Sequence, residues 1–284
     1  MMCNFDVVPL GTGSPIPDAR RAGPATLVRA GGSNVLVDCG RGVLLRLAAA
    51  GLPTPVALDA VLLTHLHSDH TTDLNDVITT RWVMSPAPMP LTIVGPFGTA
   101  AFVERTIAML HDDIGYRIAH HEDINEGPQV DVVEVAEGVA WERGGLRIVV
   151  APTDHRPVHP TVGYRFELDG RVATLAGDTV PCAGLDQLVA DADVYVQTVI
   201  RRALVEGVPF QRFQDILDYH SSTEDAGRTA AKANVGTLVL THVVPAPQPG
   251  GEADCIAEAA AHFGGTVLLP DDLDVIHVNP EGTR

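Results

Sequence analysis

Histidine and aspartate follow four separate apolar segments of this chain, and this pattern constrains the fold more than any other feature. Each segment is short and rich in β-branched residues, as strands are. In α/β sheets, functional side chains collect where strands end, so the pattern predicts one shared site at a sheet edge. The residues are His65 after Val61–Thr64, Asp154 and His155 after Ile148–Val150, Asp178 after Ala173–Gly177, and His242 after Leu238–Thr241.

Short apolar segments alternate with helix-length segments along the rest of the chain. This alternation is typical of an α/β protein whose sheets are covered by helices. We expect strands over 5–10, 34–37, 60–63, 91–94, 146–150, 172–175, 194–196, 237–240 and 266–269. We expect helices over 42–50, 98–109, 185–189, 222–233 and 254–262. Residues 111–137 are polar, acidic and weakly periodic, and we expect a loop or a lid there.

A hairpin is predicted between Tyr164–Glu167 and Val172–Leu175, because Asp169-Gly170 is a strong signal for a tight turn. We find no internal repeat and no low-complexity linker. We therefore expect a single domain over residues 1–284.

The chain carries 36 acidic and 19 basic side chains, a formal net charge of −17. This balance argues against a general nucleic-acid-binding protein, which needs a positive surface for phosphates. Arg201, Arg202 and Arg212 are the best candidates for a local basic patch, and ordinary solvated arginines are the alternative. The sequence shows neither a signal peptide nor a run of about 18 apolar residues, so we expect a cytoplasmic protein with no membrane partner.

The segment His65-Leu66-His67-Ser68-Asp69-His70 has the spacing of a metal site. Side chains alternate in extended backbone, so His65 and His67 can bind the same ion. A turn after His67 lets Asp69 and His70 face a neighbouring ion. Imidazole and carboxylate ligands together suit zinc, and manganese or iron also accept them. A site for a single metal, using part of this set, is the alternative.

The same segment resembles the His-x-His-x-Asp-His signature of the metallo-β-lactamase superfamily. Further motifs, in the same order along the chain, resemble its ribonuclease Z and arylsulfatase branch, and short actinobacterial members look especially close. The resemblance implies an α/β fold, the αββα sandwich of two mixed sheets flanked by helices, as one hydrolase domain. The motifs are Leu10–Pro15, Val37–Gly40, Gly95-Pro96, Gly163-Tyr164, Gly177–Thr179 and His220–Ser222.

The resemblance also implies a site with two zinc ions and seven protein ligands. His65, His67 and His155 would bind the first ion, Asp69, His70 and His242 the second, and Asp178 would bridge both. His159 lies between His155 and the Gly163-Tyr164 motif, and it is the alternative to His155 as a ligand. We favour His155 because it follows the preceding strand through Thr153-Asp154.

The resemblance and general chemistry give Asp69 a second role and assign roles to four residues that are not ligands. Asp69 would also accept a proton from water, and His220 would protonate the leaving alcohol, since the pKa of histidine lies near neutrality. Alternatively, His220 is a polar residue ahead of a helix that Ser222 caps. Asp38 would orient a ligand histidine or, alternatively, serve only in a turn. Ser222 and Gln197 would contact these groups or the substrate.

Two departures from the branch affect the expected substrate. Ribonucleases Z that process tRNA commonly carry a long arm between the Gly-Tyr and Gly-Asp-Thr motifs, whereas here the 13 residues 165–177 hold only the hairpin. Gln197 stands where the branch usually has a histidine, and glutamine can hydrogen-bond but cannot change its charge. The missing arm and the acidic charge make tRNA a less favoured substrate.

The leading hypothesis is a dinuclear-zinc hydrolase whose metal-bound hydroxide cleaves a phosphodiester, either at an RNA 3′ end or in a small molecule. An arylsulfatase or another small-ester hydrolase is the alternative, because the same ligands serve both reactions. A non-catalytic metal-binding protein on this fold is ranked lower, since no ligand position is lost. The resemblance suggests a homodimer.

Overall fold

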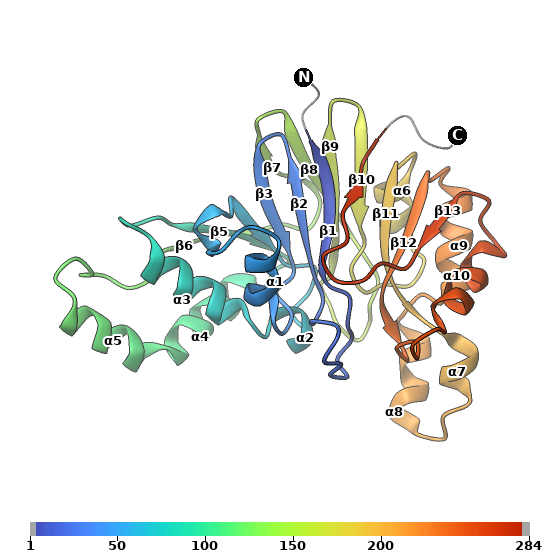
Figure 1. The fold of residues 1–284 in the computed structure, drawn as a ribbon, viewed down its shortest axis with the longest axis horizontal. Coiled ribbons are helices and arrows are strands. Elements are labelled where there is room, and N and C mark those ends of the chain that lie inside the picture. Colours follow the sequence, from blue (N-terminus) through green and yellow to red (C-terminus); the bar gives the residue numbers. More distant parts are fainter. Residues whose placement is uncertain (1–3, 280–284) are drawn as a thin grey trace.

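Short β-branched segments build two mixed sheets that face each other in the computed structural model, which describes residues 4–279 (Figure 1). The strand order is β14-β1-β2-β3-β4-β5-β6 in the first sheet and β13-β12-β11-β10-β9-β8-β7 in the second. In chain order, the strands are β1 Phe5–Gly11, β2 Ala25–Ala30, β3 Ser33–Val37, β4 Ala60–Leu62, β5 Leu91–Gly95, β6 Val130–Glu134, β7 Gly138–Arg143, β8 Leu146–Pro152, β9 Val162–Leu168, β10 Arg171–Leu175, β11 Val194–Ile200, β12 Thr237–Val244, β13 Thr266–Leu268 and β14 Ile276–His277.

Helices cover the outer face of each sheet, so the layers are helix, sheet, sheet, helix (Figure 1). One apolar cluster joins the inner faces and includes Phe5, Tyr164 and Phe166. Two others lie under the helices of the first and second sheets. The helices are α1 Val43–Ala49, α2 Ser68–Thr71, α3 Leu74–Met84, α4 Thr99–Met109, α5 His111–His120, α6 Ala183–Val189, α7 Arg202–Glu206, α8 Gln211–Gln214, α9 Thr223–Lys232 and α10 Glu252–Ala260, with 3-10 turns η1 Pro55–Ala57 and η2 Asp215–Asp218.

The hairpin prediction is confirmed by β9 and β10, which pair antiparallel from Tyr164 with Leu175 to Leu168 with Arg171. Asp169 and Gly170 have φ angles of 51° and 76°, the positive values that a type I′ turn requires. All nine predicted strands and all five predicted helices are present, with ends that differ by a few residues. The residues between Tyr164 and Gly177 therefore form only this compact hairpin.

The expectation of a loop or lid over 111–137 is wrong. This segment contains α5 and β6, and β6 pairs parallel with β5 at the edge of the first sheet. No residue of α5 is buried, and Ile114 and Ile118 are its two large aliphatic residues, so the apolar signal of this helix in the sequence is short. The structure also adds α3, β2 and β7 to the predicted elements. Over residues 4–279, no helix is long and apolar enough to cross a membrane.

Candidate metal centre

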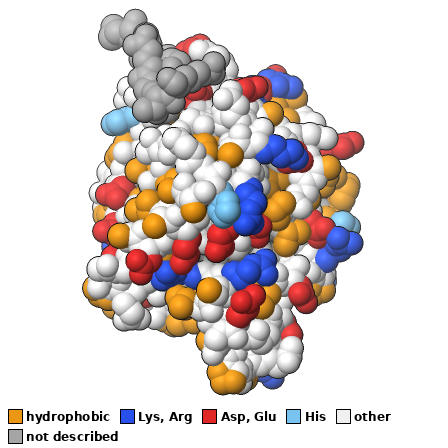
Figure 2. All heavy atoms as spheres, turned by 90° about the vertical axis from the view of Figure 1, so that its right-hand side faces the viewer, with side chains coloured by type: hydrophobic (Ala, Val, Ile, Leu, Met, Phe, Trp, Pro, Cys, Tyr) orange, Lys and Arg blue, Asp and Glu red, His pale blue; other side chains and the backbone are white. Residues whose placement is uncertain are grey.

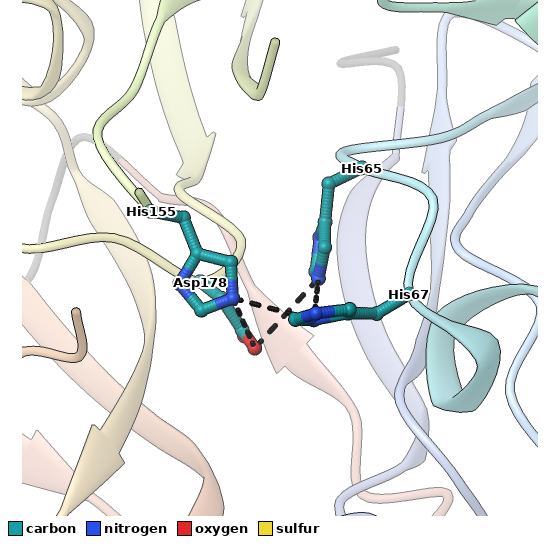
Figure 3. A group of neighbouring side chains, drawn as sticks. All are labelled: His65, His67, His155 and Asp178. Carbon is teal, nitrogen blue, oxygen red and sulfur yellow. Dashed lines mark hydrogen bonds and ion pairs between the residues drawn. The ribbon is translucent and has the colours of Figure 1, made fainter. Parts of the chain in front are cut away.

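The predicted ligands come from both sheets and meet at one edge between them. His65 and His67 follow β4, and Asp69 and His70 lie in the short helix α2 that comes next. From the second sheet, His155 follows β8, Asp178 follows β10, and His242 lies in β12. Figure 3 shows His65 and His67 pointing across the gap toward His155 and Asp178. The fold therefore brings together all seven side chains that the sequence analysis selected as ligands.

The first group consists of His65, His67, His155 and Asp178, each offering one ligand atom within 4.8 Å of the others. His67 Nδ1 lies 3.0 Å from His65 Nε2 and 3.3 Å from His155 Nε2. Asp178 Oδ2 lies 3.9 Å and 3.8 Å from the same two Nε2 atoms. Three imidazole nitrogens and one carboxylate oxygen make up a set of four donors of the kind that zinc prefers.

The second group consists of Asp69, His70 and His242. Asp69 Oδ2 lies 3.1 Å from His242 Nε2 and 3.6 Å from His70 Nε2. The Oδ2 atom of Asp178 lies 3.5 Å from His70 Nε2 and 3.9 Å from His242 Nε2. One carboxylate oxygen is therefore close to both groups, as a bridging ligand must be.

In His155 and His70, the ring nitrogen that faces away from the other ligands has a hydrogen-bond partner that fixes the ring orientation. His155 Nδ1 lies 2.8 Å from the Tyr219 carbonyl oxygen, which can only accept, so this nitrogen carries the proton. His70 Nδ1 lies 2.8 Å from Asp38 Oδ2, and Asp38 also accepts hydrogen bonds from the Thr64 amide and hydroxyl. This arrangement is usual for metal-binding histidines, because it turns the unprotonated nitrogen toward the ion.

Three buried polar atoms at this centre have no hydrogen-bond partner: His70 Nε2, Asp178 Oδ1 and His242 Nδ1. Leaving a buried polar group unpaired costs about 1–3 kcal/mol, so proteins rarely tolerate several at one place. A bound divalent cation would satisfy His70 Nε2, the nitrogen that faces Asp69 and Asp178. His242 Nδ1 is not the nitrogen that faces Asp69, so a cation bound at Nε2 would not satisfy it. The two donor groups and the unpaired His70 nitrogen therefore fit two metal ions.

Burial and the close charges set the protonation of the metal-free centre. Burial lowers the pKa of His155 to about 4 and holds the pKa of His65 well below its usual value. Burial opposes the charged form of His70 as well, but Asp178 and Asp38 raise the pKa of His70 well above normal. Asp178 stays ionised because His242 and His70 lower its pKa against the effect of burial. Metal binding would therefore replace protons held on His70 and His242.

A family model described as "Beta-lactamase superfamily domain" matches residues 33–243. A protein named Ribonuclease Z from Mycolicibacterium paratuberculosis is 59% identical over 277 residues, which cover 97% of this chain and 99% of that protein. The Ribonuclease Z of Mycobacterium bovis is 56% identical over 278 residues, with the same shares of 97% and 99%. This chain belongs to the ribonuclease Z family of the beta-lactamase superfamily. The resemblance stated from the motifs is confirmed.

Solved structures confirm the αββα fold. The metallo-beta-lactamase fold protein YhfI from Bacillus subtilis has a TM-score of 0.75 at 21% identity, covering 97% of this chain and 99% of YhfI. Human tRNase Z, short form, has a TM-score of 0.69 at 22% identity, covering 96% of this chain and 99% of the human chain. These two proteins therefore share the fold of this ribonuclease Z family member, although their sequence identity to it is low.

His220 lies beside the two groups of this ribonuclease Z family member. Its Nε2 atom is 3.3 Å from Asp178 Oδ2, and its Nδ1 atom is 3.2 Å from the Ile216 carbonyl oxygen. The His220 and His155 ring centroids are 4.8 Å apart. His220 is therefore close enough to act on a substrate bound to the metals, and its role stays a prediction.

Ser222 and Gln197 are engaged away from the centre. Ser222 forms a capping box with Asp225 at the start of α9. Its hydroxyl accepts a hydrogen bond from the Asp225 amide and so stabilises the end of this helix. Gln197 accepts a hydrogen bond from the Tyr195 hydroxyl and donates to the Thr198 carbonyl oxygen, 2.8 Å away. Its Nε2 atom also lies 3.4 Å from the Gly177 carbonyl oxygen, so it holds the backbone just before Asp178.

Two other expectations from the sequence have simple outcomes. Asp154 forms an ion pair with Arg156 and is not part of either metal group. Of the three arginines considered for a basic patch, Arg201 binds Glu258 at 2.6 Å, and Arg202 lies 3.6 Å from Asp225. Figure 2 shows basic and acidic side chains interspersed on the face that carries α9 and α10. The described residues on this face therefore form no concentrated positive patch.

A cavity of about 270 Å³ opens beside the metal groups, and part of its lining was missed by the sequence analysis. Its polar side includes His67, Asp69, Asp178, His220 and His242, and its apolar side includes Ile16, Phe213, Ile216, Tyr219 and Val244. The only signal for the apolar side is the three-residue spacing of Phe213, Ile216 and Tyr219 just before His220. This spacing is equally typical of core residues.

Proposed function

We propose that this chain is a phosphodiesterase with two metal ions that cleaves RNA at the 3′ end, with precursor tRNA as its substrate class. The observation that carries the proposal is the pair of His/Asp groups around Asp178 in a chain 59% identical to a protein named Ribonuclease Z. The relatives of that name align with nearly the whole of this chain and of themselves. They therefore have little room for a long arm, and the compact hairpin does not separate this chain from them.

The residues that would hold the metals follow the two groups in the structure. His65, His67 and His155 would bind one ion, Asp69, His70 and His242 the other, and Asp178 would lie between them. Zinc is the proposed metal, with manganese or iron as alternatives. When bound, the two ions would supply a nucleophile from water at neutral pH and offset the charge on the attacked phosphoryl group.

Two side chains of the centre are proposed to move protons. Asp69 faces both the second group and the cavity, so its carboxylate is placed to accept a proton from water. The carbonyl of Ile216 can only accept, so the neutral His220 ring keeps its proton on Nδ1. Protonated at Nε2 as well, His220 would give that proton to the leaving alcohol oxygen.

A small aromatic ester is the second candidate substrate. The cavity of about 270 Å³ is just below the usual range of about 300–1,000 Å³ for small-molecule pockets, and half of its lining is apolar. An aryl phosphodiester or aryl sulfate would suit this shape. The same metal groups would serve either reaction.

The test offers the metal-loaded protein a precursor tRNA, bis-p-nitrophenyl phosphate and p-nitrophenyl sulfate, with His67→Ala as the inactive control. We expect cleavage of the precursor at its 3′ side and turnover of the diester, both abolished in His67→Ala. Turnover of the sulfate alone would reject the phosphodiesterase proposal. The homodimer and the cytoplasmic location stay predictions.

A further inference from the structure

We propose that Phe213, Ile216 and Tyr219 form a binding site for the nucleobase next to the scissile phosphate. We call these three side chains the apolar wall. This inference rests on the proposed function and deepens it, because it says how the site would hold one nucleotide of its RNA.

The apolar wall and the metal groups line the same cavity. A phosphate held at the side of Asp69, Asp178 and His220 would place its attached nucleoside within this one cavity, facing the apolar wall. The cavity of about 270 Å³ lies just below the usual small-molecule range, so it suits one nucleotide and not several. The rest of an RNA would have to remain outside.

The apolar wall is supported from behind, so it exists before any ligand binds. Phe213 and Ile216 pack against the buried cluster of Ile200, Val205 and Val244. The Tyr219 ring lies 4.7 Å from the His220 ring and 5.1 Å from the His155 ring, measured between centroids. All three side chains are half-buried, which leaves part of each one facing the cavity. A preformed surface binds with a smaller loss of side-chain freedom.

The chemistry of the cavity favours a flat ring over a second phosphate. Among residues 4–279, the lining contains no lysine or arginine, and its two carboxylates would repel a phosphate that is not bound to metal. Aromatic and aliphatic side chains bind the faces of all bases, because every base has a π surface. We therefore infer recognition of a nucleobase by stacking, with little preference for its identity.

The experiment compares Phe213→Ala with Phe210→Ala in the metal-loaded protein. Phe210 belongs to the same segment but is 54% exposed and lies outside the cavity lining, so it is a matched control. The probes are three short RNAs with one cleavage site: one intact, one abasic on the 5′ side of the scissile phosphate, and one abasic on the 3′ side.

We expect the wild type to cleave the intact RNA about tenfold more efficiently than one of the abasic RNAs, since stacking of one base is worth about that factor or more. Phe213→Ala should reduce this ratio to near one by slowing only the intact RNA. Phe210→Ala should keep the wild-type ratio. If Phe213→Ala does not fold, Phe213→Leu removes the ring and preserves most of the apolar packing.

The inference is overturned if the wild type cleaves all three RNAs equally well, or if the variants of Phe213 keep the wild-type ratio. A wild type that cleaves no RNA, while carrying its metals, rejects the proposed function and this inference with it. Metal content and melting temperature are measured for every variant, so a damaged fold is recognised independently of the ratio.

Discussion

Two histidines follow β8, and the sequence allows either His155 or His159 to be the metal ligand. His155 is fully buried, and its Nε2 atom faces His67 at 3.3 Å. His159 is exposed and belongs to neither metal group. The choice depends on how residues 153–161 turn back on themselves, with His155 and Val158 forming an isolated antiparallel bridge. Sequence spacing alone does not determine such a turn.

His155→Ala should abolish binding of the first metal, whereas His159→Ala should leave the metal content unchanged. The reason is that His155 supplies one of four donor atoms that lie within 4.8 Å of each other. Elemental analysis after metal loading and desalting gives the number of ions per chain. Equal metal loss in both variants would contradict the assignment.

His220→Ala should lower kcat on precursor tRNA by about 10²–10⁴-fold, the usual contribution of a general acid, and should leave both metals bound. His220 contacts Asp178 but belongs to neither metal group, so its loss removes no ligand. Metal content and single-turnover rates are measured on the same sample. Loss of an ion would instead identify His220 as a ligand.

At the scale of elements, the loop after β1 supports the strand that carries His242. Asp272 accepts hydrogen bonds from the Thr12 amide and hydroxyl, at 2.9 Å and 2.8 Å, and from Arg46 Nε at 3.0 Å. The carbonyl of Thr12 in turn accepts the amide of His242 at 3.1 Å. His242 has a φ of 51°, which is strained for a residue with a side chain. Asp272 therefore helps to hold His242 in its unusual conformation.

Asp272→Ala should weaken the second metal site by about tenfold and affect the first site less, because only the second contains His242. Asp271→Ala is the control, since the carboxylate of this exposed neighbour pairs with Arg21, whereas the Thr12 amide donates to Asp272. Competition with a chromophoric chelator gives both affinities. Equal affinities in Asp272→Ala and the wild type would show that the loop does not position His242.

The elements predicted from the sequence are those whose burial leaves a pattern. Strands such as β1 and β11 are buried along their whole length, so apolar residues dominate their sequences. The two His/Asp groups were predictable because their residue types and spacing have few other uses. The apolar wall was not predictable, because half-buried cavity residues look like core residues. The helix α5 was not predictable, because Ile114 and Ile118 alone give too short an apolar pattern. The contact of Gln197 with the Gly177 carbonyl was not predictable, because only the fold brings these two residues near.

At the scale of the whole molecule, the metals should stabilise the contact between the two sheets. Each sheet contributes ligands, so bound ions link them, and removal leaves buried polar atoms unpaired. Chelation should lower the melting temperature by about 10 °C, as expected for ligands held at about 1,000 times their dissociation constant. Differential scanning fluorimetry measures the shift, and His67→Ala should show a smaller one. An unchanged melting temperature would mean that the sheets do not depend on the ions.

The net charge of −17 leads to a prediction about RNA cleavage as a function of salt. A protein that neutralises 6–10 nucleic-acid phosphates with lysine and arginine loses about 10³–10⁵-fold in affinity between about 50 mM and 200 mM salt. Here long-range charge repels a polyanion, and salt screens that repulsion because the Debye length falls to about 10 Å at 0.1 M. We expect kcat/KM on precursor tRNA to stay constant or rise over this range. Bis-p-nitrophenyl phosphate is the control for salt effects on the centre itself, and a steep fall with tRNA alone would reveal a basic RNA-binding surface.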